Sequence, residues 1–72
     1  MAIAWEVPVY STNAQAIGYD PDTKEMFVTW NSGRRSAYAS VPEEVAIECS
    51  KAASVGQYLN REIKPNFPHK YV

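Results

Sequence analysis

Side chains suited to binding an anion lie in two stretches of this chain, one at residues 34–38 and one along residues 54–64. Cations hold phosphate oxygens and aromatic faces stack on a base, so such a set favours a small anionic ligand such as a nucleotide. The alternative is that the tyrosines belong to the core and the cations only solubilise the surface. The predicted ligand-binding residues are Arg34, Arg35, Tyr38, Ser54, Gly56, Tyr58, Asn60, Arg61 and Lys64.

The pattern does not assemble the groups that catalysis or a metal ion would need. Cys49 lies on the apolar stripe of a predicted helix, and the single histidine, His69, stands beside a proline in the C-terminal tail. A catalytic cysteine needs a nearby base and a lowered pKa. Residues 20–25 resemble half of a calcium loop but lack its glycine and its distant glutamate. We predict no catalytic residue, no metal site, no cofactor and no enzymatic activity, and the role of His69 stays open.

The second of these stretches is predicted to be a short helix with a marked start and stop. Ser54 and Gln57 have the spacing of a capping box, and Pro65 disfavours helix beyond Lys64. Apolar residues recur every fourth position from Val55 to residue 63, so they form one buried stripe. Gly56, in the first turn, leaves backbone N–H groups uncovered, and such groups attract anions.

The first half of the chain predicts a small antiparallel sheet. Alternating apolar residues indicate strands at residues 14–19, 25–30 and 35–40, with turns at 20–23 and 31–33. Met26, Val28 and Trp30 are predicted to share one face of the middle strand. Residues 5–9 alternate as well, but Pro8 permits only an edge strand or an irregular arm.

A first helix is predicted to follow the sheet directly. Ser40 and Glu43 have capping-box spacing, with Pro42 in the first turn, and Ile47 falls off the apolar stripe. Residues 66–72 are predicted to be a proline-broken tail that folds back on the domain. The expected class is α+β, an antiparallel three- to four-stranded meander followed by two short helices packed on one face.

Length and composition indicate one globular domain over residues 1–72, with its core at about residues 11–68. No apolar run is long enough to span a bilayer, no basic leader begins the chain, and a single cysteine excludes an internal disulfide, so we expect a cytoplasmic protein. The net charge of −1 argues against a general polyanion binder. The small clusters of cations suit one compact anionic ligand better, although ordinary solvated charge explains them equally well.

The chain is also predicted to form a homo-oligomer, most simply a two-fold dimer, with the ligand site at or near the interface. A domain of 72 residues is close to the lower limit for a self-sufficient core. Apolar side chains in irregular ends, together with Ile47, would then cover each other across the interface. A symmetric contact would also present the same cations twice. The alternative is that the ends cover their own domain.

A known family is similar to this chain in residue order over roughly residues 11–68. The residues that carry the resemblance are Ala16-Ile17-Gly18-Tyr19-Asp20, Val28, Gly33, Tyr38, Val41-Pro42, Ala53-Ser54, Gly56, Tyr58, Asn60, Ile63-Lys64 and Phe67-Pro68. They resemble the KTSC-domain family, a short domain found alone in bacterial and phage proteins and at the C-terminus of some lysyl-tRNA synthetases. Ser36 stands where the family has the first tyrosine of Tyr-x-Tyr, Val55 replaces a basic residue, and Phe67 replaces a common tyrosine.

The resemblance implies a setting but not an established activity. The occurrence of the family in phages implies a phage or mobile-element protein that sequesters a signalling (cyclic) nucleotide, an anti-defence role, in the cytoplasm of a bacterial host. The synthetase context implies an RNA-binding module as the alternative, although the missing aromatic and basic residues weaken it. A protein-interaction or structural module is a third possibility.

Overall fold

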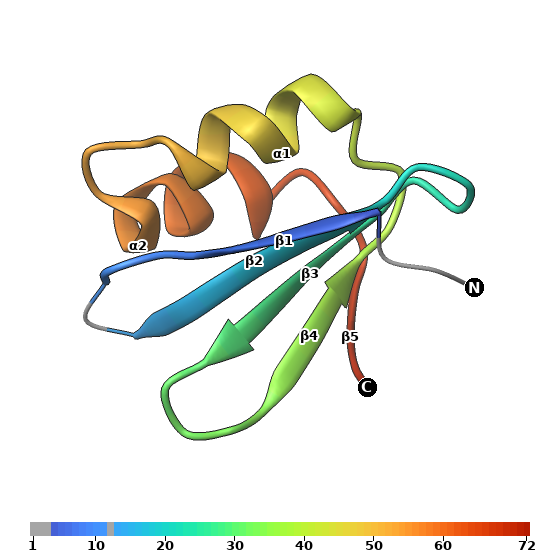
Figure 1. The fold of residues 1–72 in the computed structure, drawn as a ribbon. Coiled ribbons are helices and arrows are strands. Elements are labelled where there is room, and N and C mark those ends of the chain that lie inside the picture. Colours follow the sequence, from blue (N-terminus) through green and yellow to red (C-terminus); the bar gives the residue numbers. More distant parts are fainter. Residues whose placement is uncertain (1–3, 12) are drawn as a thin grey trace.

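The computed structural model describes residues 4–11 and 13–72, and it shows one antiparallel sheet with the helices on one side (Figure 1). The five strands lie in the sheet in their sequence order, and helices α1 and α2 and a turn of π-helix, η1, come between β4 and β5 in the chain. The predicted α+β class is therefore confirmed. The bounds are Trp5–Pro8 (β1), Ala14–Asp20 (β2), Glu25–Trp30 (β3), Arg35–Tyr38 (β4), Glu43–Ser50 (α1), Val55–Tyr58 (α2), Leu59–Ile63 (η1) and His69–Tyr71 (β5).

Strand alternation gives the sheet an inner face toward the helices and an outer face away from them. Met26 and Val28 of β3 belong to the hydrophobic core with Trp30 packed against it, whereas Phe27 points to the outer face. This division of β3 is the predicted one. Pro8 lies in β1, which is an edge strand, also as predicted.

The start of α1 differs from the prediction. Pro42 is the N-cap and no side chain caps the helix, while Ser40 lies two residues earlier with a positive φ of 62°. The predicted capping role of Ser40 is therefore wrong, because the backbone turns before the helix begins. Glu43 and Glu44 in the first turn favour the positive end of the helix dipole instead. Glu43 also accepts a hydrogen bond from the Trp5 indole N–H at 3.1 Å.

The second helix begins at the predicted cap and buries the predicted apolar stripe, but it continues as a π-helical turn rather than an α-helical one. The Ser54 hydroxyl oxygen accepts a hydrogen bond from the Gln57 N–H at 3.4 Å, and Val55, Leu59 and Ile63 are all buried. The Lys64 N–H donates to the Leu59 carbonyl at 2.8 Å, a bond to the fifth residue back rather than the fourth. This bond defines η1, and π turns of this kind are frequent at functional sites.

The C-terminal segment completes the sheet. The irregular tail predicted for residues 66–72 is wrong at His69–Tyr71, which pairs antiparallel with β4 as β5. Pro68 precedes the strand, and its carbonyl accepts a hydrogen bond from the Ala39 N–H at 3.0 Å, so the proline does not interrupt the pairing. Phe67 packs against the core, as expected for a tail that folds back. The sheet consequently has one more strand than the upper limit of the prediction.

The described helices include none with the length and apolar character needed to cross a bilayer.

Candidate functional site

A pocket opens on the inner face where β4, β5 and the end of η1 meet. We call it the β4–β5 pocket, and its volume is about 470 Å³. Tyr71 and His69 come from β5, Ser36 and Tyr38 from β4, and Lys64 from the residue after η1. The complete lining is Asn13, Trp30, Ser32, Arg34, Ser36, Tyr38, Lys64, His69 and Tyr71.

The back of the pocket is held by hydrogen bonds through one buried hydroxyl. Ser36 is fully buried, and its Oγ accepts a hydrogen bond from the Trp30 indole N–H at 2.7 Å. The same oxygen lies 2.9 Å from His69 Nε2. Because an indole N–H can only donate, the Ser36 proton remains available for a neutral His69. The Ser36 hydroxyl thus holds both the Trp30 ring of β3 and the His69 imidazole of β5 in place.

The aromatic rings of the pocket also contact each other. The ring centres of Tyr38 and His69 are 5.0 Å apart, and those of His69 and Tyr71 are 4.8 Å apart in an edge-on arrangement. Both separations are within the range of favourable ring pairs. The imidazole of His69 is therefore packed between two tyrosines, while Tyr71 itself remains 60% exposed and accessible from solvent.

Two cations lie over two of the rings. The Arg34 guanidinium carbon is 4.8 Å from the centre of the Tyr71 ring, and the Lys64 ammonium is 5.4 Å from a ring of Trp30. A cation within about 6 Å of an aromatic face is attracted by the ring quadrupole. Among the lining residues that the structure describes there is no carboxylate, so neither cation is neutralised within the pocket.

The Ser36–His69 pair has the residue types of a nucleophile and its base, but its geometry suits a structural hydrogen bond. Ser36 is inaccessible to a substrate at 0% exposure, and its oxygen already accepts the Trp30 proton. A serine nucleophile also needs its base oriented by a third group. The lining residues within the described part of the chain supply no carboxylate for that role. The arrangement can bind an anion and stack a planar group.

The structure brings together only part of the predicted ligand-binding set. Arg34, Tyr38 and Lys64 line the β4–β5 pocket. Asn60 and Arg61 line a separate hollow with Gln57 on the second helix. The nine predicted residues therefore do not form one site.

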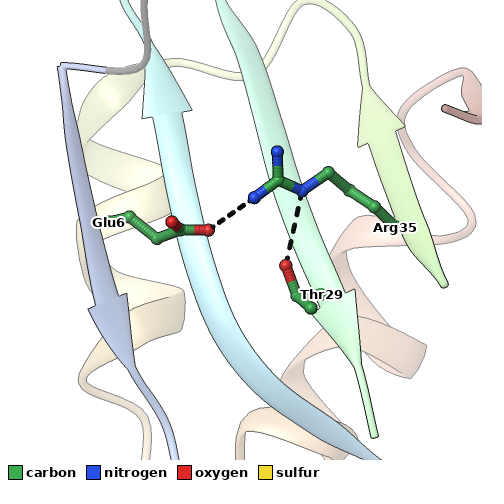
Figure 2. Close-up of polar contacts among 3 residues, drawn as sticks. All are labelled: Glu6, Thr29 and Arg35. Atoms are coloured by element: carbon green, nitrogen blue, oxygen red, sulfur yellow. Dashed lines mark hydrogen bonds and ion pairs between the residues drawn. The ribbon is translucent and has the colours of Figure 1, made fainter. Parts of the chain in front are cut away.

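Arg35 lies on the opposite side of the sheet from Arg34. Figure 2 shows its side chain reaching from β4 over β3 toward β1. Its guanidinium forms an ion pair of 3.0 Å with Glu6 and a longer hydrogen bond of 3.4 Å to the Thr29 hydroxyl. The Phe27 ring lies beneath it at 6.0 Å. Arg35 is thus engaged within the fold and does not face the pocket.

The other predicted residues of the second helix make structural contacts. Ser54 caps the helix, and a Cβ at Gly56 would lie 3.1 Å from the Ser11 hydroxyl, closer than an ordinary van der Waals contact. The Tyr58 hydroxyl donates to Glu48 at 2.9 Å. Burial, with this hydrogen bond to a carboxylate, raises the pKa of Tyr58 to about 12. These contacts tie α2 to α1 and to the loop after β1.

The residues first considered for catalysis or metal binding are placed elsewhere. Cys49 is fully buried in the core, and burial raises the pKa of its thiol to about 12, the opposite of an activated cysteine. Asp20 accepts a hydrogen bond from the Asp22 N–H at 3.0 Å, as the predicted turn requires. Its Oδ2 is buried with no hydrogen-bond partner among the described residues. Within residues 4–11 and 13–72, no group of three metal-ligating side chains gathers.

Sequence reasoning missed most of the pocket lining. Trp30 was predicted to share one face of the middle strand with Met26 and Val28, but no ligand-binding role was predicted for Trp30 or Ser36, which both line the pocket. His69 and Tyr71 were missed because their segment was read as an irregular tail. The available signal is their spacing of two, which puts both side chains on one face of a strand.

The chain is similar to one protein family, to two bacterial proteins and to a solved structure. Residues 10–67 match the model of a family described as the KTSC domain. An uncharacterized protein of Stutzerimonas stutzeri is 34% identical over 59 residues, which cover 82% of this chain and 83% of that protein. A protein of Tsukamurella paurometabola is 35% identical over 60 residues, covering 83% and 90%. The crystal structure of a KTSC domain protein from Yersinia pestis superposes with a TM-score of 0.86 at 28% identity, covering 94% of this chain and 96% of that one.

Proposed function

The chain belongs to the KTSC domain family, and from that premise we propose that it is a non-enzymatic binding protein for a small anionic ligand with a planar aromatic group, most simply a nucleotide. The proposed site is the β4–β5 pocket. One observation carries the proposal: two cations and two accessible aromatic rings face the same hollow, and no carboxylate lines it within the described residues.

The cations provide the anion-binding half of the site. Arg34 is exposed and Lys64 is exposed, so both side chains can turn from the rings toward a ligand. A guanidinium presents paired donors that match two phosphate oxygens, and an ammonium adds a compact charge. A phosphate that enters between them replaces two cation–ring contacts with charge-assisted hydrogen bonds, which are stronger than neutral ones.

The rings provide the second half. The Arg34 guanidinium lies over the ring of Tyr71 and the Lys64 ammonium lies over the ring of Trp30, so a charged group rather than an apolar side chain covers each ring face. When the cations move to a phosphate, the ring faces become free to stack on a base, a contact worth about 1–3 kcal/mol per base. A ligand that has both a phosphate and a base should therefore bind more tightly than a phosphate or a base alone.

Calorimetry with a panel of mono-, di- and cyclic nucleotides tests the proposal. Arg34→Gln is expected to weaken binding about tenfold or more, since hydrogen bonds to charged groups contribute about 1.5–3 kcal/mol. Arg61→Gln is the matched control, because Arg61 lines the separate hollow and its loss should leave the affinity unchanged. The absence of binding across the panel, or equal losses in both variants, would contradict the proposal.

The same panel separates the RNA-binding alternative. A small nucleotide that makes few phosphate contacts should lose little affinity between low and moderate salt. Structured RNA, which is held by many phosphates, should lose affinity steeply. Tight RNA binding with a steep salt slope and no nucleotide binding would favour the alternative.

A further inference from the structure

Among the described residues, the edge of β5 that faces away from β4 has backbone groups without hydrogen-bond partners. The Val72 N–H donates to the Arg35 carbonyl and the Ala39 N–H donates to the Pro68 carbonyl, both at 3.0 Å. In an antiparallel ladder, hydrogen-bonded pairs alternate with pairs that make no backbone bonds to each other. Lys70 is therefore a bonded partner of Ala37, and the N–H and C=O groups of His69 and Tyr71 point away from β4.

The β5 edge is open to strand addition, whereas the opposite edge of the sheet, β1, contains a proline. All residues of β5 are exposed, and among the described residues β5 pairs only with β4. In β1, the bond from the Val9 N–H to the Gln15 carbonyl makes Pro8 the outward-facing residue next to it. Proline has no N–H to offer there. Strand addition is accordingly blocked at Pro8 and available at β5.

Lys70 determines which strand can add to this edge. If β5 of a second copy paired antiparallel through the groups of His69 and Tyr71, each Lys70 would lie opposite the other. In a pair without backbone bonds the Cα atoms approach to about 4.5 Å, and like charges directly opposite are destabilising. Lysine on an edge strand is a common device against pairing between copies. The same lysine favours a strand that places a carboxylate opposite it.

We propose that the β5 edge docks an extended segment of another protein, with an acidic residue opposite Lys70. Strand addition supplies main-chain hydrogen bonds, and alternate side chains supply specificity. The acidic side chain would lie on the outer face beside Lys70. Its neighbours on the added strand would lie on the inner face, next to His69 and Tyr71 and the positively charged β4–β5 pocket. Charge therefore favours an acidic segment on both faces, and this inference does not depend on the pocket binding a nucleotide.

The chain itself supplies a defined acidic probe. Unlabelled Lys70→Glu protein offers the same strand with a carboxylate at the central position and can be titrated into ¹⁵N-labelled wild-type protein at millimolar concentration. We expect the amide signals of His69 and Tyr71 to move downfield as their N–H groups gain acceptors. The amide of Lys70, already bonded to β4, should move much less. Binding should be at least about fivefold tighter than in a titration with unlabelled wild-type protein.

A charge-matched control uses Lys51→Glu, which changes an exposed lysine at the end of α1, away from β5. It should produce shifts at His69 and Tyr71 no larger than those produced by unlabelled wild-type protein. Equal shifts with both variants would show general charge attraction and would overturn the proposal. Equally strong pairing with unlabelled wild-type protein would identify a second copy as the occupant and would also overturn it. No shift at β5 with Lys70→Glu would show that the edge does not accept a strand.

Discussion

Arg34 and Arg35 are consecutive in the sequence but lie on opposite faces of the sheet. Arg35 is bound to Glu6 and Thr29 on the outer face, above Phe27. Arg34 covers Tyr71 at the mouth of the β4–β5 pocket, and no carboxylate among the described lining residues neutralises it. One arginine thus contributes to the fold, while the other is the residue that our proposal assigns to the ligand.

The difference shows that two basic residues that are consecutive in sequence do not necessarily act at the same site. Alternation sends neighbours to opposite faces, and the two faces are built differently. The inner face is covered by helices (Figure 1), and it also holds the Trp30–Ser36 hydrogen bond behind the pocket. Among the described residues no helix covers the outer face, where long side chains such as Arg35 lie instead. Perturbations of the inner face should therefore have larger effects.

The largest expected effect is alkaline unfolding, which acts on the inner side alone. Burial raises the pKa values of Tyr19 and Tyr38, and it raises those of Cys49 and Tyr58 to about 12. The neutral forms favour the folded state, so the contribution of Cys49 and Tyr58 is complete below pH 9 and is lost as the pH rises through about 12. The raised pKa values of Tyr19 and Tyr38 act in the same direction. Circular dichroism should show cooperative loss of structure in that window. Retained structure well above pH 12 would contradict this prediction.

Truncating a buried ring on each face should cost different amounts. Tyr38→Ala on the inner face should lower the free energy of unfolding by about 3–5 kcal/mol, because the helix layer limits collapse of the cavity. Phe27→Ala removes a ring of comparable burial from the outer face, where exposed side chains can relax into the space, so the loss should be smaller. Urea denaturation of the two variants measures the contrast. Equal losses would show that the two faces are equally rigid.

Ser36→Ala tests the hydrogen-bond network behind the pocket. It leaves the indole N–H of Trp30 without its acceptor, and an unsatisfied buried donor costs about 1–3 kcal/mol. The matched outer-face change is Thr29→Val, which removes only a 3.4 Å hydrogen bond from Arg35. It should change the free energy of unfolding by less than about 0.5 kcal/mol. Denaturation midpoints and the indole fluorescence of each variant report both effects.

A similarly small effect is expected for Arg35→Gln. Its ion pair with Glu6 is partly exposed, with both side chains at 38%, and such pairs contribute about 0.2–1 kcal/mol. The loss should shrink further in high salt, and nucleotide binding should be unchanged. Thermal denaturation at two ionic strengths gives the stability term. A binding defect equal to that of Arg34→Gln would remove the distinction between the two arginines.

Much of the fold was predictable because its signals are local. The alternation of β3, the stripe of Val55, Leu59 and Ile63, and the turn at Asp20 each depend on residues close in sequence, and all appear in the structure. The capping role given to Ser40 failed because its spacing is correct but its backbone has a positive φ. The fifth strand was missed because its partner, β4, lies more than thirty residues earlier in the chain.

The site was only partly predictable for the same reason. Arg34, Tyr38 and Lys64 were predicted, since cations and rings can be recognised by type. The separation of Arg61 and Arg35 from them depends on helix phase and strand face. Trp30, Ser36, His69 and Tyr71 come together only when β5 pairs with β4. The predicted homo-oligomer stays a prediction. The exposed apolar side chains include Ile47 in α1 and Tyr10 in the segment between β1 and β2.

The widened turn η1 sets the direction of Lys64. Each residue of an α-helix rotates the chain by about 100° about the helix axis. A chain one residue shorter within η1 could form ordinary α-helical bonds throughout, but every later side chain would then be rotated by about 100°. Lys64 would leave the ring of Trp30, and the following segment would approach β4 from another angle. In its geometry the π turn is equivalent to a one-residue insertion in an α-helix, and here it sets the direction of Lys64 and of the segment that leads to β5.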